Sequence, residues 1–181
     1  MPEGTRLRVI GVDPGLRITG WAVIGLEASR LIYVAHGTVK SRDRDSLAER
    51  LVQLFDGLTA VIAEQRPDEA AVEETFVNRN PTTTLALGQA RAVALLTPAR
   101  AGLPVFEYTP NLIKKTVVGA GHAAKEQVQA MVRILVRGCP VVQADAADAL
   151  AIAICHAHHR TAIRRLQAAE RTAALATESR P

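Results

Sequence analysis

Three short apolar runs rich in β-branched residues open the chain, at residues 7–12, 18–24 and 31–39. Runs of this length predict buried strands. Pro14 and Gly15 end the first run, and proline followed by glycine favours a tight turn in which the glycine takes a positive φ. Because the connections between the runs are short, we expect the three strands to form an antiparallel meander.

An amphipathic helix and a fourth strand follow the meander. Residues 69–72 are a short β-prone run, and Arg66, Pro67 and Asp68 should end the helix that precedes it. Since a helical crossover comes before this run, we expect its strand to pair in parallel with the first strand. The apolar stripe of the helix recurs every three or four positions, at Leu47, Leu51, Leu54, Leu58 and Ile62.

The second half of the chain predicts mainly helices. Asn80 and Pro81 form the pattern of an N-cap followed by proline at the first helical position, which opens a helix over 82–99. A fifth short strand is expected at 105–108. These elements indicate an α/β domain. Three more helices are predicted, over 112–118, 123–136 and 144–158.

Composition limits the class of protein. With 181 residues, of which 48% are hydrophobic, the chain can bury one sizeable core, so we expect one domain over 1–166 and a polar tail over 167–181. No apolar run approaches the roughly 20 residues of a membrane span, and residues 1–8 are too polar for a signal peptide, so a cytoplasmic location is expected. Cys139 and Cys155 follow no metal-ligand spacing and suggest neither a disulfide framework nor a zinc site.

Charge and aromatic content bear on the partners. The net charge of +4 permits binding to a polyanion but does not by itself indicate it. An aromatic content of 3% argues against a platform that stacks single-stranded bases, because such a platform needs several exposed rings. A histidine run at 156–159 falls near the end of the last predicted helix, where histidine complements the helix dipole, so we assign it no ligand role.

Four carboxylates stand out. Asp13 and Glu73 each follow a predicted strand, and Asp145 and Asp148 lie three residues apart on one face of the last helix. Like charges at that spacing destabilise a helix slightly, a cost that a purely structural helix has no reason to carry. The alternatives are an Asx turn at Asp13 and a solvated acidic first turn at Asp145 and Asp148.

If the four carboxylates meet at one edge of the sheet, they need cations to offset their repulsion. Oxygen-only ligands select Mg²⁺ or Mn²⁺. Two such ions about 4 Å apart can bind the attacking and leaving oxygens of a phosphodiester displacement. The residues therefore favour metal-dependent phosphodiester hydrolysis.

Several strings resemble the RuvC family of bacterial Holliday-junction resolvases, in the same order along residues 8–158. They are VIGVDPGLRITGWAVI, AAVEETFVNRNPTTTLALGQAR, the segment 113–121 and QADAADALAIAICHAH. The resemblance implies an RNase H-like fold, a five-stranded mixed sheet with helices on both faces. It implies an endonuclease that cuts two strands of a four-way DNA junction symmetrically during homologous recombination and DNA repair. It also implies a homodimer, Mg²⁺ or Mn²⁺ as cofactor with two ions per subunit, and the RuvA and RuvB branch-migration proteins as partners.

The family's functional residues map onto this chain. Its four catalytic and metal-binding acids match Asp13, Glu73, Asp145 and Asp148, and the spacing to Phe76 selects Glu73 over Glu74. Its DNA-contacting lysines match Lys114 and Lys125, and its base-probing phenylalanine matches Phe76. The glycine turn over 119–121 follows Lys114 and Lys115, which favours phosphate contact there and adds Lys115 to the expected DNA-binding residues. The structural alternatives are solvated lysines, a core position for Phe76 and a simple helix connection at the glycines.

Two other functions share part of this pattern. An actin-like or sugar-kinase ATPase has a similar glycine-rich strand-turn-strand opening, but it needs a second domain and a second phosphate loop, for which the chain is too short. A non-catalytic protein that binds branched DNA could keep the fold, but it would not need all four carboxylates. A homodimer would match the two-fold symmetry of a junction. Its expected interface is the small-residue face of the 82–99 helix, with Gly88, Ala92 and Ala99.

Overall fold

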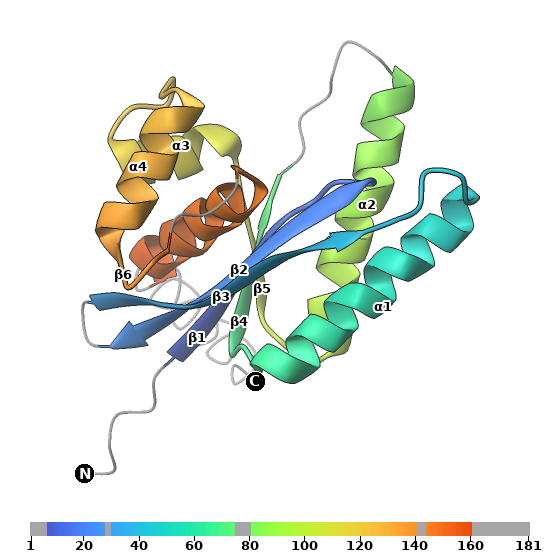
Figure 1. Ribbon diagram of the computed structural model, residues 1–181, viewed down its shortest axis with the longest axis horizontal. Coiled ribbons are helices and arrows are strands. Elements are labelled where there is room, and N and C mark those ends of the chain that lie inside the picture. The colour runs from blue at the N-terminus through green and yellow to red at the C-terminus, as the bar shows by residue number, and fades with distance from the viewer. Residues whose placement is uncertain (1–6, 28–29, 75–80, 141–143, 161–181) are drawn as a thin grey trace, which may run out of the picture.

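The computed structural model describes residues 7–27, 30–74, 81–140 and 144–160. They form one mixed sheet in the strand order β5-β4-β1-β2-β3-β6, with helices on both of its faces (Figure 1). This is the α/β architecture that the pattern of apolar residues predicts.

The first three strands form the expected meander. β1 (Leu7–Asp13) pairs antiparallel with β2 (Ile18–Glu27), and β2 pairs antiparallel with β3 (Arg30–Lys40). The register of the first pair places Asp13 opposite Gly20. The turn between these strands differs from the prediction, because Gly15 does not take a positive φ. Glycine is needed there for space, since a Cβ would collide with the carbonyl oxygen of Ile18.

The parallel half of the sheet is also as predicted. β4 (Glu69–Glu73) pairs in parallel with β1, and β5 (Val105–Tyr108) pairs in parallel with β4. β1 is therefore a central strand with neighbours on both sides. The carboxyl ends of β1 and β4 lie at the same edge of the sheet.

The prediction of five strands is short by one. β6 (Val136–Arg137) pairs in parallel with β3, with Leu31 opposite Val136. Two residues are too few to show an alternating pattern, so the sequence analysis predicts that the preceding helix runs through residue 136. In the structure that helix, α4 (Lys125–Leu135), ends one residue earlier.

Helices cover the two faces separately (Figure 1). α1 (Leu47–Gln65) and α2 (Pro81–Arg100) pack on one face, while α3 (Pro110–Val118), α4 and a helix over 144–160 pack on the other. Each face has its own apolar core, because alternate residues of β1 point to opposite sides: Ile10 joins the α1 and α2 side, and Val9 the other. Within the ranges given above, no helix is both long enough and apolar enough to cross a membrane.

Capping residues fix several helix boundaries. Ser46 and Glu49 form a capping box at the start of α1, and Arg66 ends that helix in the left-handed conformation, at the predicted stop. Thr109 caps α3 by accepting a hydrogen bond from the backbone of Leu112. The predicted cap at Asn80 lies outside the described residues.

The helix over 144–160 is anchored by a buried polar network. His156 is fully buried, and its Nδ1 and Nε2 atoms lie 2.8 Å from the hydroxyl of Tyr108 and from a carboxylate oxygen of Glu69. Arg160 donates to the same carboxylate oxygen over 2.7 Å. These buried contacts hold His156 in place, which the expected helix-dipole role of the 156–159 run did not include. The network joins this helix to β4 and β5.

Candidate active site

Asp13 and Glu73 are the last residues of two neighbouring parallel strands, β1 and β4. Both carboxylates therefore stand at the same edge of the sheet. The helix over 144–160 begins above this edge and brings Asp145 and Asp148 in its first two turns. Segments more than 130 residues apart in the sequence thus contribute to one site.

The position of this helix depends on two glycines in the sheet below it. A Cβ on Gly11 would collide with the backbone of Ala149 and Ala153, and a Cβ on Gly20 would lie 2.5 Å from the carbonyl oxygen of Asp145. Because both glycines lack a side chain, the helix backbone rests directly on β1 and β2. The acids at its start are held close to Asp13 as a result.

The four carboxylates interact electrostatically. Burial raises the pKa of Asp13 to about 8, and the negative charges of Glu73, Asp148 and Asp145 contribute to this shift. Burial and the charge of Asp148 also raise the pKa of Glu73, although Lys114 and Lys125 oppose the shift. A carboxylate with such a raised pKa favours a proton or a cation beside it. The two acids are therefore poised to bind positive charge.

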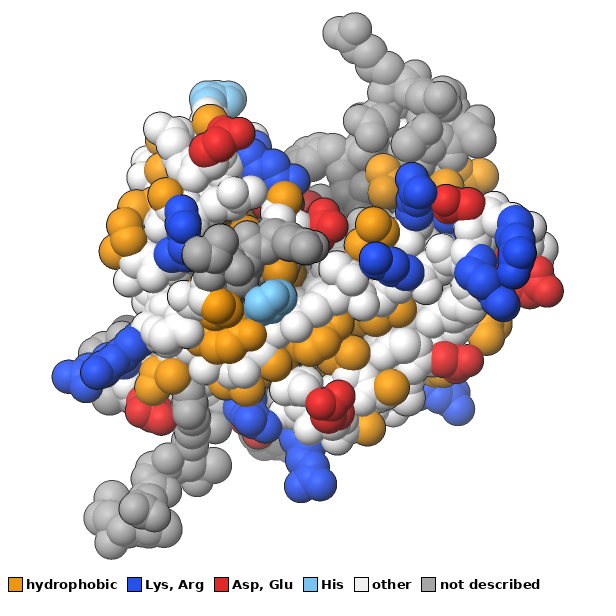
Figure 2. Space-filling view, viewed as in Figure 1, with side chains coloured by type: hydrophobic (Ala, Val, Ile, Leu, Met, Phe, Trp, Pro, Cys, Tyr) orange, Lys and Arg blue, Asp and Glu red, His pale blue; other side chains and the backbone are white. Residues whose placement is uncertain are grey.

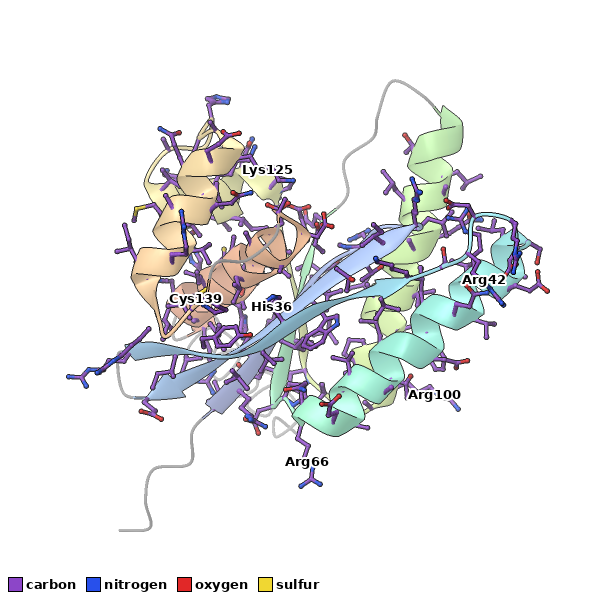
Figure 3. The ribbon with its side chains drawn as sticks, viewed as in Figure 1. His36, Arg42, Arg66, Arg100, Lys125 and Cys139 are labelled. Atoms are coloured by element: carbon purple, nitrogen blue, oxygen red, sulfur yellow. The ribbon has the colours of Figure 1, made fainter. Side chains whose placement is uncertain are left out.

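Two lysines supply part of that charge. The ammonium of Lys125, the first residue of α4, lies 2.8 Å from Oδ2 of Asp148. Figure 3 shows Lys125 extending from α4 toward the start of the 144–160 helix. Hydrogen bonding to Asp148 raises the pKa of Lys125. Lys114, on α3, acts on Glu73 from the same side of the site.

A pocket of about 250 Å³ connects these groups. Two acids, Glu73 and Asp148, and two lysines, Lys114 and Lys125, line it together. In the space-filling view, acidic and basic side chains meet at the hollow between the α3 and α4 helices and the rest of the molecule (Figure 2). The sequence did not indicate the remaining lining, because it comes from three separate helices: Pro110, Ile113, Val128 and Ala151.

The other predicted site residues lie differently. Asp13 and Asp145 do not line the pocket, although their charges act on its residues. Lys115 is exposed and also lies outside the lining. Phe76 falls outside the described residues.

The donor set fits a hard divalent cation in its chemistry, because all four side chains offer carboxylate oxygens. Within the described part of the chain, however, no three acidic, histidine or cysteine side chains converge closely enough to coordinate one ion as they stand. Mutual repulsion and the ion pair between Lys125 and Asp148 both work against such convergence. A bound ion would have to draw the carboxylates together.

Comparisons with known proteins agree on one family. The family model described as "Crossover junction endodeoxyribonuclease RuvC" matches residues 9–156. A relative of that name from Paramagnetospirillum magneticum is 62% identical over 154 residues, which cover 85% of this chain and 93% of the relative. Another, from Rhodopseudomonas palustris strain TIE-1, is 59% identical over 162 residues, covering 90% of this chain and 93% of the relative.

A solved structure shows the same similarity in three dimensions. It is described as "T. thermophilus RuvC in complex with Holliday junction substrate" and is 33% identical, with a TM-score of 0.77. The match covers 83% of this chain and 93% of that one. Sequence and fold lead to the same conclusion: the chain belongs to the RuvC family of crossover junction endodeoxyribonucleases.

Proposed function

We propose that this chain resolves four-way DNA junctions by hydrolysing one phosphodiester bond in each of two symmetric strands, through the carboxylates of Asp13, Glu73, Asp145 and Asp148. The observation that carries the proposal is that Asp13 and Glu73 end two paired parallel strands while the helix bearing Asp145 and Asp148 rests on the same sheet edge. Burial and the other three acids raise the pKa of Asp13 to about 8, as expected for such a cluster. A site of this kind attracts cations, and two of its acids, Glu73 and Asp148, line the pocket beside Lys114 and Lys125.

The cofactor in this proposal is Mg²⁺, for which Mn²⁺ can substitute, with two ions per subunit. The four carboxylates would hold the ions by their oxygens. When bound, such ions stabilise charge on the attacking and leaving oxygens of a phosphodiester. The role of the protein is to keep four acids at one place and to balance them with two lysines.

DNA contacts in this proposal come from the lysines that line the pocket. Lys114 and Lys125 would bind backbone phosphates next to the acids, which places the scissile bond at the carboxylates. Lys115 would add a phosphate contact farther out, since it is exposed beside Lys114. Phe76 would probe bases at the crossover, a role that rests on the family resemblance.

Two strands must be cut, so we propose a homodimer with two-fold symmetry. α2 exposes a stripe of apolar and small residues spaced three or four apart on one helix face. In it, Leu85 is 65% exposed and Leu96 is 57% exposed, and their place on one stripe favours a covered surface. We call this set the α2 stripe: Leu85, Gly88, Ala92, Leu96 and Ala99.

The wider setting is proposed from resemblance and sequence. The branch-migration proteins RuvA and RuvB are the expected partners. The cytoplasm is the expected location, and residues 1–166 the expected catalytic domain, with a polar tail over 167–181.

The test is cleavage of a synthetic four-way junction. With Mg²⁺ the wild type should cut two opposite strands, and Asp145→Asn should cut none while binding the junction normally in Ca²⁺, because lysines rather than acids supply the affinity. Asp56→Asn is the matched control, since Asp56 is an exposed aspartate on α1, on the other face of the sheet. Wild-type protein that binds junctions in Mg²⁺ without cutting them would support the non-catalytic alternative.

A further inference from the structure

The ion pair between Lys125 and Asp148 joins the proposed phosphate-binding lysine to a proposed metal ligand. Their Nζ and Oδ2 atoms are 2.8 Å apart, the distance of a charge-assisted hydrogen bond. The electrostatic influence of Lys125 extends further, because its charge also lowers the raised pKa values of Asp13 and Glu73. The ammonium thus partly offsets the negative charge of the whole site.

A divalent cation at Asp148 would compete with this ammonium. Both use the oxygens of the same carboxylate, and two cations held by one carboxyl group repel each other. Asp148 therefore cannot bind an ion at full strength while Lys125 occupies Oδ2. Lys114 provides a comparison, because it lines the same pocket and acts on Glu73 through its charge. Among the described residues, only Lys125 forms an ion pair with one of the four carboxylates.

Lys125 is free to exchange partners. Its side chain is 53% exposed, whereas that of Asp148 is 29% exposed, so the lysine is the member of the pair that can swing toward solvent. The pocket of about 250 Å³ beside it leaves room for this movement. A backbone phosphate of DNA offers the ammonium a second anionic partner at the same place.

We propose that the ion pair with Lys125 keeps Asp148 from binding metal, and that a DNA phosphate breaks this pair by binding Lys125 instead. Metal and junction then bind cooperatively. This inference rests on the proposed function, since it takes Asp148 to be a metal ligand and Lys125 a DNA contact. Its effect would be to limit full metal loading to protein that already holds DNA. By linkage, metal must then strengthen DNA binding by the same factor as DNA strengthens metal binding.

The first experiment measures Mg²⁺ and Ca²⁺ binding to the full chain without DNA, by calorimetry and by the shift in melting temperature. Lys125→Met removes the charge but keeps an unbranched side chain, and Lys114→Met is the control for the loss of any nearby positive charge. We expect Lys125→Met to tighten metal binding by about tenfold, equivalent to roughly 1.4 kcal/mol, and Lys114→Met to tighten it clearly less. Equal affinities for the two variants would overturn the proposal.

The second experiment repeats the Ca²⁺ titration with a saturating four-way junction, which Ca²⁺ should leave uncut. DNA should tighten metal binding more in the wild type than in Lys125→Met, because the variant has no lysine to displace. An equal gain in both proteins would also overturn the proposal. The proposed function fails separately, if the wild type does not cut junctions in Mg²⁺ at all.

Discussion

Gly20 lies opposite Asp13 in the sheet and directly beneath the backbone of Asp145. A Cβ on Gly20 would be 2.5 Å from the carbonyl oxygen of Asp145 and 3.5 Å from its Cβ. The missing side chain of one residue therefore allows two of the four carboxylates to approach each other.

Replacing Gly20 by alanine should displace the start of the 144–160 helix. Overpacking of this kind costs about 1–3 kcal/mol of stability. We also expect junction cleavage per folded molecule to fall by at least about tenfold, because tenfold corresponds to only 1.4 kcal/mol of barrier. Cleavage rates in Mg²⁺, corrected for the folded fraction by circular dichroism, measure this effect.

The control for this change is Gly57→Ala. A Cβ on Gly57 of α1 would collide with the side chain of Val39, on the face of the sheet away from the carboxylates. The variant should lose comparable stability but keep its cleavage rate per folded molecule. If both variants lose cleavage equally, Gly20 matters only for folding.

The raised pKa of Asp13 predicts how stability depends on pH in the presence of EDTA. An aspartate whose pKa rises from 3.8 to about 8 on folding binds a proton more tightly in the folded state. Its protonation stabilises the fold fully below the unfolded value, and this stabilisation is lost as the pH rises through about 8. The melting temperature should therefore fall between pH 5 and pH 8.5.

Asp13→Asn tests whether ionisation of Asp13 causes this fall in melting temperature. The amide cannot ionise, so the variant should melt higher than the wild type at pH 8.5 and should show a flatter pH profile. Mg²⁺ should raise the melting temperature of the wild type more at pH 8.5 than at pH 5, because metal competes with the proton. A wild-type profile that is flat in EDTA would contradict the assigned environment of Asp13.

Lys114 and Lys115 are adjacent but should differ in function. Each neutralised phosphate contributes about 0.9 to the slope of log affinity against log salt on duplex DNA, so either alanine variant should flatten the slope. Only Lys114 lines the pocket beside Glu73, so only Lys114→Ala should also reduce cleavage of fully bound junction. Fluorescence anisotropy at several salt concentrations and single-turnover kinetics separate the two effects. Equal cleavage defects would place Lys115 in the site as well.

The α2 stripe predicts a self-association surface. Leu96→Lys places a charge within the stripe and should weaken the dimer by about tenfold or more, since a buried unpaired charge is costly. Sedimentation at micromolar concentration should show a dimer for the wild type and a shift toward monomer for the variant. Val52→Lys is the control, because Val52 is 56% exposed on α1, outside the stripe. A wild type that is monomeric both free and on junction DNA would refute the dimer.

The sequence by itself determined most of the elements. The apolar stripe of α1, the short strands and the helix stop at Arg66 all depend on neighbours within a few positions, so local periodicity and capping predict them. It also placed Asp13 and Glu73 at one sheet edge, because parallel pairing across a helical crossover brings the ends of β1 and β4 together.

The tertiary structure decided what depends on contacts between distant segments. β6 forms because Val136 and Arg137 pair with the edge of β3. His156 is a core residue because Glu69 of β4 and Tyr108 of β5 bind its two ring nitrogens. The same holds for the Lys125 and Asp148 ion pair and for the contact of Gly20 with Asp145. None of these leaves a periodic signal in the sequence, because packing brings the partners together from positions that the chain keeps far apart.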